Sequence, residues 1–340
     1  MRTRIHLPFL LFLGWVLAWA GCSNGVEGPK PSAELVTPQV VCHQAETWVL
    51  IDGAGFSPAP VDALTDDPAM ALPQVTLSLM SDVDGSALTQ VDTLLNPDAA
   101  DPANLRVKWI NGRQLSFLVD PALALARGVY DVSVRNPTGG RTLLPQAFTA
   151  VPPPTLDSAL PTPICTAQYE NEIVLTGAFF LQIGEALPTV NVGGVDFTPV
   201  AMEDCAPIAG PRVDVQACNT MRIQVGVDQV GVGAHAVTVT NPAPASCVSS
   251  EAVTLHIVPP PVVEEITPEP VCLEQGERAL TVTGEGYLEL DGVGPTVTVG
   301  GVSASVTGLD GCADIEGLAG ARTCTSIAIV LADDALSARA

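Results

Sequence analysis

The sequence predicts an all-β protein built from tandem β-sandwich domains. The first observation is an internal repeat, because Val151-Pro152-Pro153-Pro154 returns as Val258-Pro259-Pro260-Pro261. The second is a series of short alternating, β-branched segments that Gly and Pro residues separate. A repeat of roughly a hundred residues is too long for a solenoid and suits a row of independent domains.

The N-terminus predicts export. Basic Arg2 and Arg4 precede an apolar stretch that is too short to span a bilayer, so residues 1–21 are interpreted as a signal peptide. Ala20-Gly21 before Cys22 resembles a bacterial lipobox, in which Cys22 would be lipidated after cleavage. The alternative is ordinary secretion with Cys22 as a plain thiol. Ser23 favours the outer membrane by analogy with such lipoproteins.

The charge balance argues against nucleic acid as a partner. The chain has 37 Asp and Glu against 14 Lys and Arg, for a formal net charge of −23. Such a surface repels phosphate backbones. Solubility and divalent-cation binding are both consistent with the acidity, and solubility is the simpler explanation.

The middle repeat shows the expected strands in order. Each segment alternates apolar and polar residues and ends at Gly, Pro or Asn, which is typical of a sandwich. The expected strands cover residues 154–160, 172–177, 189–194, 221–225, 236–242 and 252–258.

The first repeat has the same order. Residues 49–56 and 128–137 match strands of the middle repeat, and Asn111-Gly112 predicts a two-residue hairpin between residues 105–110 and 114–119. Trp109 alternates with apolar neighbours and is expected in the core. The polar stretch 57–104 is interpreted as an inserted loop.

Several of these strings resemble the IPT/TIG family of immunoglobulin-like modules, which occurs in plexins, some transcription factors and bacterial surface proteins. They are Leu50-Ile51-Asp52-Gly53-Ala54-Gly55-Phe56, Val192-Gly193-Gly194-Val195 and Gly128-Val129-Tyr130 with Asn136-Pro137. The resemblance implies three immunoglobulin-like β-sandwiches, core positions for Phe56 and Tyr130, and no catalytic residues. The expected organisation is a signal peptide (1–21), a tether (22–33) and domains at 34–151, 152–258 and 259–340.

The third repeat is expected to be incomplete. Residues 326–331 match 115–119, and residues 335–340 match 122–127. In the first repeat the next residue is Gly128, which opens the penultimate strand. We therefore expect a longer polypeptide whose continuation has a glycine, an alternating strand, Asn-Pro and a cysteine before a final strand.

Cysteine positions predict disulfides in an oxidising compartment. Cys205 and Cys218 bracket a loop, and Cys312 and Cys324 bracket its counterpart, so each pair is expected to be bonded. Cys165 and Cys247 are expected to pair at one pole of the middle domain. For Cys42 two states stay open: a free thiol, or a disulfide with a cysteine outside its own repeat. Cys272, the equivalent of Cys165, is expected to bond a residue in the missing closing segment of the third repeat.

No motif of enzyme chemistry is present. The sequence has no G-x-S-x-G nucleophile elbow, no H-E-x-x-H zinc-protease motif and no G-x-x-x-x-G-K-[ST] phosphate loop. No cofactor or metal is expected. Asp82-Val83-Asp84-Gly85-Ser86 begins like a calcium loop, but Thr93 stands where a bidentate Glu is needed. A polar hairpin tip is the expected role of this segment.

These observations predict a non-enzymatic, lipid-anchored protein of the outer membrane or cell surface. Its tandem modules would form a stalk or an adhesion array, held to the membrane by the lipid and free to bind an extracellular protein or polysaccharide. Two alternatives remain: the stalk of a secreted hydrolase whose catalytic domain lies beyond residue 340, and a polysaccharide-binding module. Scarce aromatic residues weigh against the latter.

Overall fold

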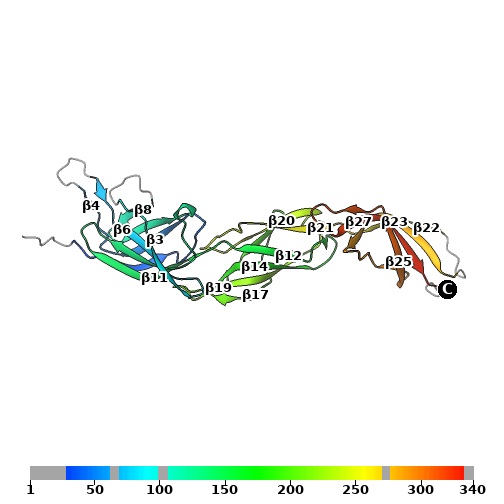
Figure 1. The fold of residues 1–340 in the computed structure, drawn as a ribbon, viewed down its shortest axis with the longest axis horizontal. Helices are drawn as coiled ribbons and strands as arrows, with labels where there is room; N and C mark the ends of the chain where they lie inside the picture. Colours follow the sequence, from blue (N-terminus) through cyan, green and yellow to red (C-terminus); the bar gives the residue numbers. More distant parts are fainter. Residues whose placement is uncertain (1–27, 62–68, 99–105, 270–275, 333–340) are drawn as a thin grey trace, which may run out of the picture.

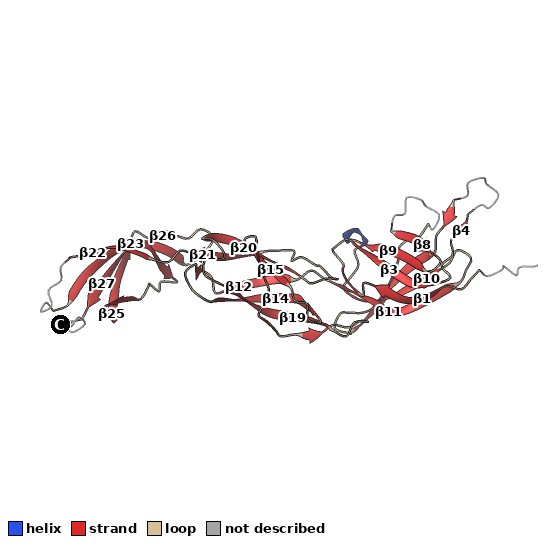
Figure 2. Ribbon diagram, turned by 180° about the vertical axis from the view of Figure 1, so that it is seen from behind, coloured by secondary structure: helices blue, strands red, loops and turns tan. Residues whose placement is uncertain are grey.

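The computed structural model describes residues 28–61, 69–98, 106–269 and 276–332. The lipidation candidate Cys22 and the cysteine Cys272 lie outside these ranges. The described chain forms three β units in an elongated row, called here units 1, 2 and 3 in chain order (Figures 1 and 2). Its helical content is a single 3₁₀ turn, η1 (Pro121–Leu123). Within the described residues, no helix is both long and apolar enough to cross a membrane.

Unit 2 is a sandwich of two five-stranded sheets. The first sheet has the order β12-β14-β19-β17, with β18 also on β19, and the second has the order β13-β21-β20-β15-β16. The strands of the first sheet are β12 (Thr155–Leu160), β14 (Asn171–Ile183), β17 (Ala201–Glu203), β18 (Ala206–Pro207) and β19 (Val215–Val225). Those of the second are β13 (Ile164–Cys165), β15 (Thr189–Val192), β16 (Val195–Phe197), β20 (Gly233–Thr240) and β21 (Val253–Val258).

Unit 1 has two corresponding sheets, one of four strands in the order β1-β3-β9-β8 and one of five in the order β2-β11-β10-β6-β7. The first sheet contains β1 (Ser32–Thr37), β3 (Thr47–Ala54), β8 (Val107–Asn111) and β9 (Gln114–Val119). The second contains β2 (Val40–Cys42), β6 (Gln74–Ser81), β7 (Ala87–Leu94), β10 (Gly128–Arg135) and β11 (Arg141–Val151). A small hairpin joins β4 (Ala59–Pro60) to β5 (Met70–Ala71).

The interpretation of residues 57–104 as an inserted loop is wrong for its central part. Strands β6 and β7 lie within it and pair with each other as β15 and β16 do in unit 2. Val75, Leu77 and Leu79 alternate along β6 and are buried, which is the period-two pattern of a half-buried strand. The stretch therefore supplies two regular strands of the sandwich as well as loops.

In unit 3 the described strands form one sheet of order β22-β23-β27-β25-β24, with β26 on β27. The strands are β22 (Val262–Thr267), β23 (Arg278–Leu290), β24 (Val297–Val299), β25 (Val302–Asp310), β26 (Ala313–Asp314) and β27 (Ala321–Leu331). By position, β22, β23 and β27 are the counterparts of β12, β14 and β19. The described part of unit 3 contains no counterparts of β20 and β21.

The strand order of units 1 and 2 is immunoglobulin-like, because one sheet holds the first, second, fifth and fourth strands of the fold and the other holds the third, sixth and seventh. Tyr130 adds a local signature of that fold. It lies near the start of β10, is 2% exposed, and donates its hydroxyl to the Ala126 carbonyl oxygen at 2.8 Å. This is the tyrosine-corner geometry of the sixth strand. Phe56 is also buried.

A glycine at one position of each unit permits the close approach of the first two strands. A Cβ at Gly53 would collide with the carbonyl oxygen of Ser32, and one at Gly177 would collide with that of Thr155. Each glycine sits at the end of the apolar string that the sequence repeats. Only a residue without a side chain lets the paired strands pass so closely.

Candidate functional site: the joint between units 1 and 2

One of the disulfides locates a contact between units 1 and 2. The structure joins Cys205 to Cys218 and Cys312 to Cys324, the two local pairs that repeat alignment predicts. The expected pair Cys165–Cys247 is wrong. Cys247 is bonded instead to Cys42 of unit 1, across a sequence separation of 205. Cys165 is a free, partly exposed thiol.

Strand register explains the correction. Cys165 pairs with Val258 at the end of β21, whereas Cys247 precedes the start of β21. A strand of this length spans roughly 20 Å at about 3.3 Å per residue. The two cysteines therefore lie at opposite ends of unit 2, too far apart for a disulfide. Cys247 faces unit 1, and Cys165 faces unit 3.

A hydrophobic cluster surrounds the Cys42–Cys247 bond. Unit 1 contributes the ends of β2 and β11, and unit 2 contributes β14, β19, the segment between β18 and β19, and the loop between β20 and β21. The buried members are Val40, Cys42, Val151, Leu181, Ile183, Ile208, Val215, Ala245 and Cys247. Because these side chains are packed away from water, the joint is stabilised by hydrophobic burial as well as by the covalent bond.

Hydrogen bonds also cross the joint. The Thr149 hydroxyl of β11 donates to the Ala209 carbonyl oxygen at 2.8 Å, and the Ala209 backbone N–H donates to the Val83 carbonyl oxygen at 2.6 Å. Val83 is 6% exposed although it sits in the loop between β6 and β7. That loop is therefore seated against unit 2 and is part of the joint.

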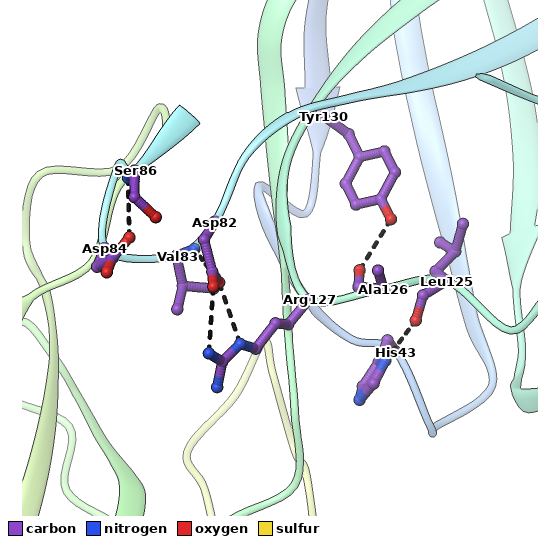
Figure 3. Close-up of polar contacts among 9 residues, drawn as sticks. All are labelled: His43, Asp82, Val83, Asp84, Ser86, Leu125, Ala126, Arg127 and Tyr130. Atoms are coloured by element: carbon purple, nitrogen blue, oxygen red, sulfur yellow. Dashed lines mark hydrogen bonds and ion pairs between the residues drawn. The ribbon is translucent and has the colours of Figure 1, made fainter. Parts of the chain in front are cut away.

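An arginine clamps the same loop. Arg127 directs its guanidinium at both carboxylate oxygens of Asp82, with a nitrogen–oxygen distance of 3.1 Å on each side (Figure 3). The guanidinium also lies 5.4 Å from the centre of the Phe179 ring in unit 2. A cation over an aromatic face is attracted by its quadrupole. Arg127 thus holds the β6–β7 loop within unit 1 and also contacts unit 2.

The calcium-like segment forms this hairpin tip. The backbone N–H of Asp82 donates to the Ser86 carbonyl oxygen at 2.9 Å. The Ser86 N–H donates to the Asp84 carboxylate at 2.8 Å (Figure 3). Hydrogen bonds from the Ser86 side chain and backbone lower the pKa of Asp84. The carboxylate of Asp82 is already paired with Arg127. The segment therefore has the role of a polar turn that positions Val83.

His43 follows Cys42 and fixes the neighbouring loop. Its Nδ1 lies 2.6 Å from the Leu125 carbonyl oxygen, so the ring donates there (Figure 3). Its backbone N–H donates to the Val151 carbonyl oxygen at 3.1 Å. The backbone bond holds the chain after Cys42 against β11, and the ring bond holds it to the segment between η1 and β10.

Unit 1 also exposes apolar side chains on two edge strands. Strand β7 is an edge strand on which Leu88, Val91 and Leu94 are each more than two-fifths exposed. Trp109, expected in the core, is 43% exposed, and its Nε1–H donates to the Phe56 carbonyl oxygen at 3.0 Å. The reason is position: β8 is the edge strand of its sheet, so one side of the ring stays open.

One acidic and cysteine group has the geometry of a possible metal site. Glu289, Cys312 and Cys324 place their ligand atoms within 4.8 Å of one another. The two sulfurs are bonded to each other, so neither is a thiolate, the form that binds metals. Glu289 instead pairs with Arg322.

The joint could not be predicted from the sequence repeats, because an alignment of repeats compares the residues of one unit with those of another. It contains no information on how the units pack against each other. One signal was available. Cys42 has a counterpart in Cys165, but unit 1 has no counterpart of Cys247. A cysteine in a first repeat without an internal partner indicates a bond to the next repeat.

Comparisons with known proteins give loose structural similarities. No protein-family model matches the chain, and none of the curated protein sequences matches it. The plexin A4 extracellular region is 13% identical over 93% of this chain, with a TM-score of 0.29, and this chain spans only 22% of it. The ectodomain of mouse nectin-like molecule 4 is 11% identical over 84% of this chain and 86% of its own, with a TM-score of 0.25. The fold assignment rests on the strand order of the units themselves.

Proposed function

We propose that this chain is a non-enzymatic cell-surface protein whose tandem immunoglobulin-like units act as a stiff spacer or binding array. The observation that supports it best is the joint between units 1 and 2. A disulfide, a buried apolar cluster and cross-unit hydrogen bonds act at one contact. Such a contact fixes the direction of unit 1 on unit 2, which is what a spacer requires.

The anchor of this spacer is Cys22, lipidated after removal of residues 1–21. A diacylated cysteine would attach the row to the outer membrane or cell surface by its first unit, since each buried methylene contributes about 0.8 kcal/mol. Substituting Cys22→Ser should move the protein from the membrane fraction to the soluble fraction. Unchanged membrane association would count against the anchor.

A binding role has one specific observation in its favour. The exposed apolar residues of β7 and the half-open ring of Trp109 lie on edge strands of unit 1. Large apolar side chains that stay exposed are common at protein-binding sites when they are contiguous. An extracellular protein is therefore the partner class that this face suits.

The spacer is tested by small-angle X-ray scattering of the oxidised protein. The double variant Cys42→Ser/Cys247→Ser should broaden the distribution of distances between units, because the covalent restraint is gone. The matched control is Cys205→Ser/Cys218→Ser, which removes a disulfide inside unit 2 and should leave the distances between units unchanged. An equally narrow distribution for both double variants would remove the support for a stiffened joint.

A further inference from the structure

The junction of units 2 and 3 contains an open apolar groove. Its volume is about 290 Å³. Unit 2 contributes Cys165 and Val258, and unit 3 contributes Val282, Gly286, Tyr287 and Leu288. The thiol of Cys165 is free and partly exposed there.

This groove is the repeat counterpart of the filled joint between units 1 and 2. Cys165 pairs with Val258 in the same parallel register in which Cys42 pairs with Val151. Leu288 follows Tyr287, which is opposite Cys324, as Leu181 follows Phe180, which is opposite Cys218. At the first joint, Cys42, Val151 and Leu181 are buried under Ala245 and Cys247, which belong to the loop between β20 and β21. In the groove, the corresponding three residues line an open space.

The polar groups of the groove repeat as well. In unit 2 the Leu181 N–H donates to Asn241 Oδ1 at 2.9 Å, and Asn241 Nδ2 donates to the Phe179 carbonyl oxygen at 2.9 Å. Asn241 opens the same loop and is followed by Pro242. The counterparts of Phe179 and Leu181 are Gly286 and Leu288. Both line the groove, so its backbone offers the donor and acceptor that an asparagine amide bonds.

We propose that this groove is the docking site of a β-hairpin with an Asn-Pro turn and a cysteine, and that Cys165 forms a disulfide with that cysteine. The occupant is the closing hairpin of the third repeat, with the chemistry of β20 and β21. At the junction of units 2 and 3, this disulfide would be the counterpart of the Cys42–Cys247 disulfide. Two thiols lose two protons and two electrons to a disulfide oxidant, which is reduced to two thiols.

The experiment uses the full chain and a probe of known sequence. Residues 233–258, which carry Asn241 and Cys247, are appended directly after Ala340, and the fusion is oxidised with oxidised glutathione. Peptide mapping without reduction should find Cys165 joined to the appended cysteine. The rate at which Cys165 reacts with a maleimide should fall about tenfold or more, because a buried or bonded thiol is protected.

Two variants of the fusion separate docking from chance oxidation. Leu288→Glu places a charge in the groove and should abolish the Cys165 crosslink, whereas Val293→Glu, at a position 71% exposed, should leave it intact. Replacing the appended asparagine by alanine should reduce the crosslink. The proposal is overturned if Cys165 stays as reactive as in the parent chain, or if the appended cysteine crosslinks equally well in both glutamate variants.

The source of the hairpin is tested on protein purified from its own cells. Mapping without reduction should place Cys165 in a disulfide with a cysteine of the same polypeptide, in a peptide that contains Asn-Pro. A crosslink from Cys165 to another polypeptide, or to Cys165 of a second copy, would contradict the proposed occupant. This result is independent of the spacer proposal, which depends on the Cys42–Cys247 joint.

Discussion

His235 of unit 2 occupies the place that Tyr130 holds in unit 1, and each side chain reaches the carbonyl oxygen four residues earlier. The Tyr130 hydroxyl bonds Ala126 at 2.8 Å, and His235 Nε2 lies 2.7 Å from the Gly231 carbonyl oxygen. Both residues are the third of a strand that begins with a glycine of positive φ, Gly128 or Gly233. The contact is therefore a property of the repeat that two different side chains can supply.

Removing the Tyr130 hydroxyl should destabilise unit 1. Tyr130→Phe leaves the Ala126 carbonyl oxygen without this donor and should lower the free energy of unfolding by roughly 1 kcal/mol, the typical contribution of one hydrogen bond. Thermal unfolding measured by calorimetry is the test. Tyr169→Phe is the matched control, since Tyr169 is 85% exposed. Equal effects of the two substitutions would contradict a structural role for the corner.

Because of the same tyrosine, the free energy of unfolding of unit 1 should fall at alkaline pH. Burial raises the pKa of Tyr130 to about 12, above its ordinary value of 10.0. Between these values the unfolded chain releases the proton and the folded chain keeps it, so stability falls as pH rises from 10 to 12. Tyr130→Phe should show a shallower decline over that range. An unchanged slope would mean that Tyr130 titrates alike in both states.

Sequence patterns predicted the strands wherever alternation was strong and a glycine or proline marked the end. Residues 155–160 and 253–258 are examples, and both are strands in the structure. Strand β6 was missed because its polar surroundings masked Val75, Leu77 and Leu79. The sequence left open a bond from Cys42 to a residue outside its repeat, but it did not identify Cys247 as the partner, and the reason is different. The pairing depends on how two folded units pack, and alternation within a strand carries no information on that packing.

A side chain at Gly177 should destabilise unit 2. Gly177→Ala would bring a Cβ onto the Thr155 carbonyl oxygen, so β12 must shift away from β14. Overpacking of this kind typically costs about 1–3 kcal/mol. Gly231→Ala is the control, because a Cβ at that position meets no atom within 4 Å. The two variants are compared by thermal unfolding, and equal melting temperatures would count against the close approach.

Residues 82–101 should bind no calcium tightly. The Asp82 carboxylate is paired with Arg127, and Thr93 at the twelfth position lies in β7 and lacks a carboxylate. Titration of the full chain with calcium should give no strong heat. Arg127→Ala frees Asp82, yet the missing twelfth ligand should still prevent tight binding. A dissociation constant below about 1 µM would show that this hairpin tip is a calcium loop after all.

Disulfide mapping decides how the first two units are connected. A digest of the oxidised protein without reduction should contain the Cys42 peptide bonded to the Cys247 peptide, because their Cα atoms lie 5.4 Å apart, within the range that a disulfide spans. Cys42→Ser should free one thiol, at Cys247, while Cys165→Ser should leave the Cys42–Cys247 bond intact.

The alternative disulfide, between Cys165 and Cys247, has a structural consequence that can be measured. If Cys247 were bonded to Cys165, the two ends of β21 would have to meet, because Val258 is the partner of Cys165 in the sheet. That requires β21 to leave β20, with which it pairs from Gly233 to Val237. Amide hydrogen exchange in β21 would then be fast. Slow exchange there, together with the Cys42–Cys247 peptide, would establish that the disulfide connects the two units.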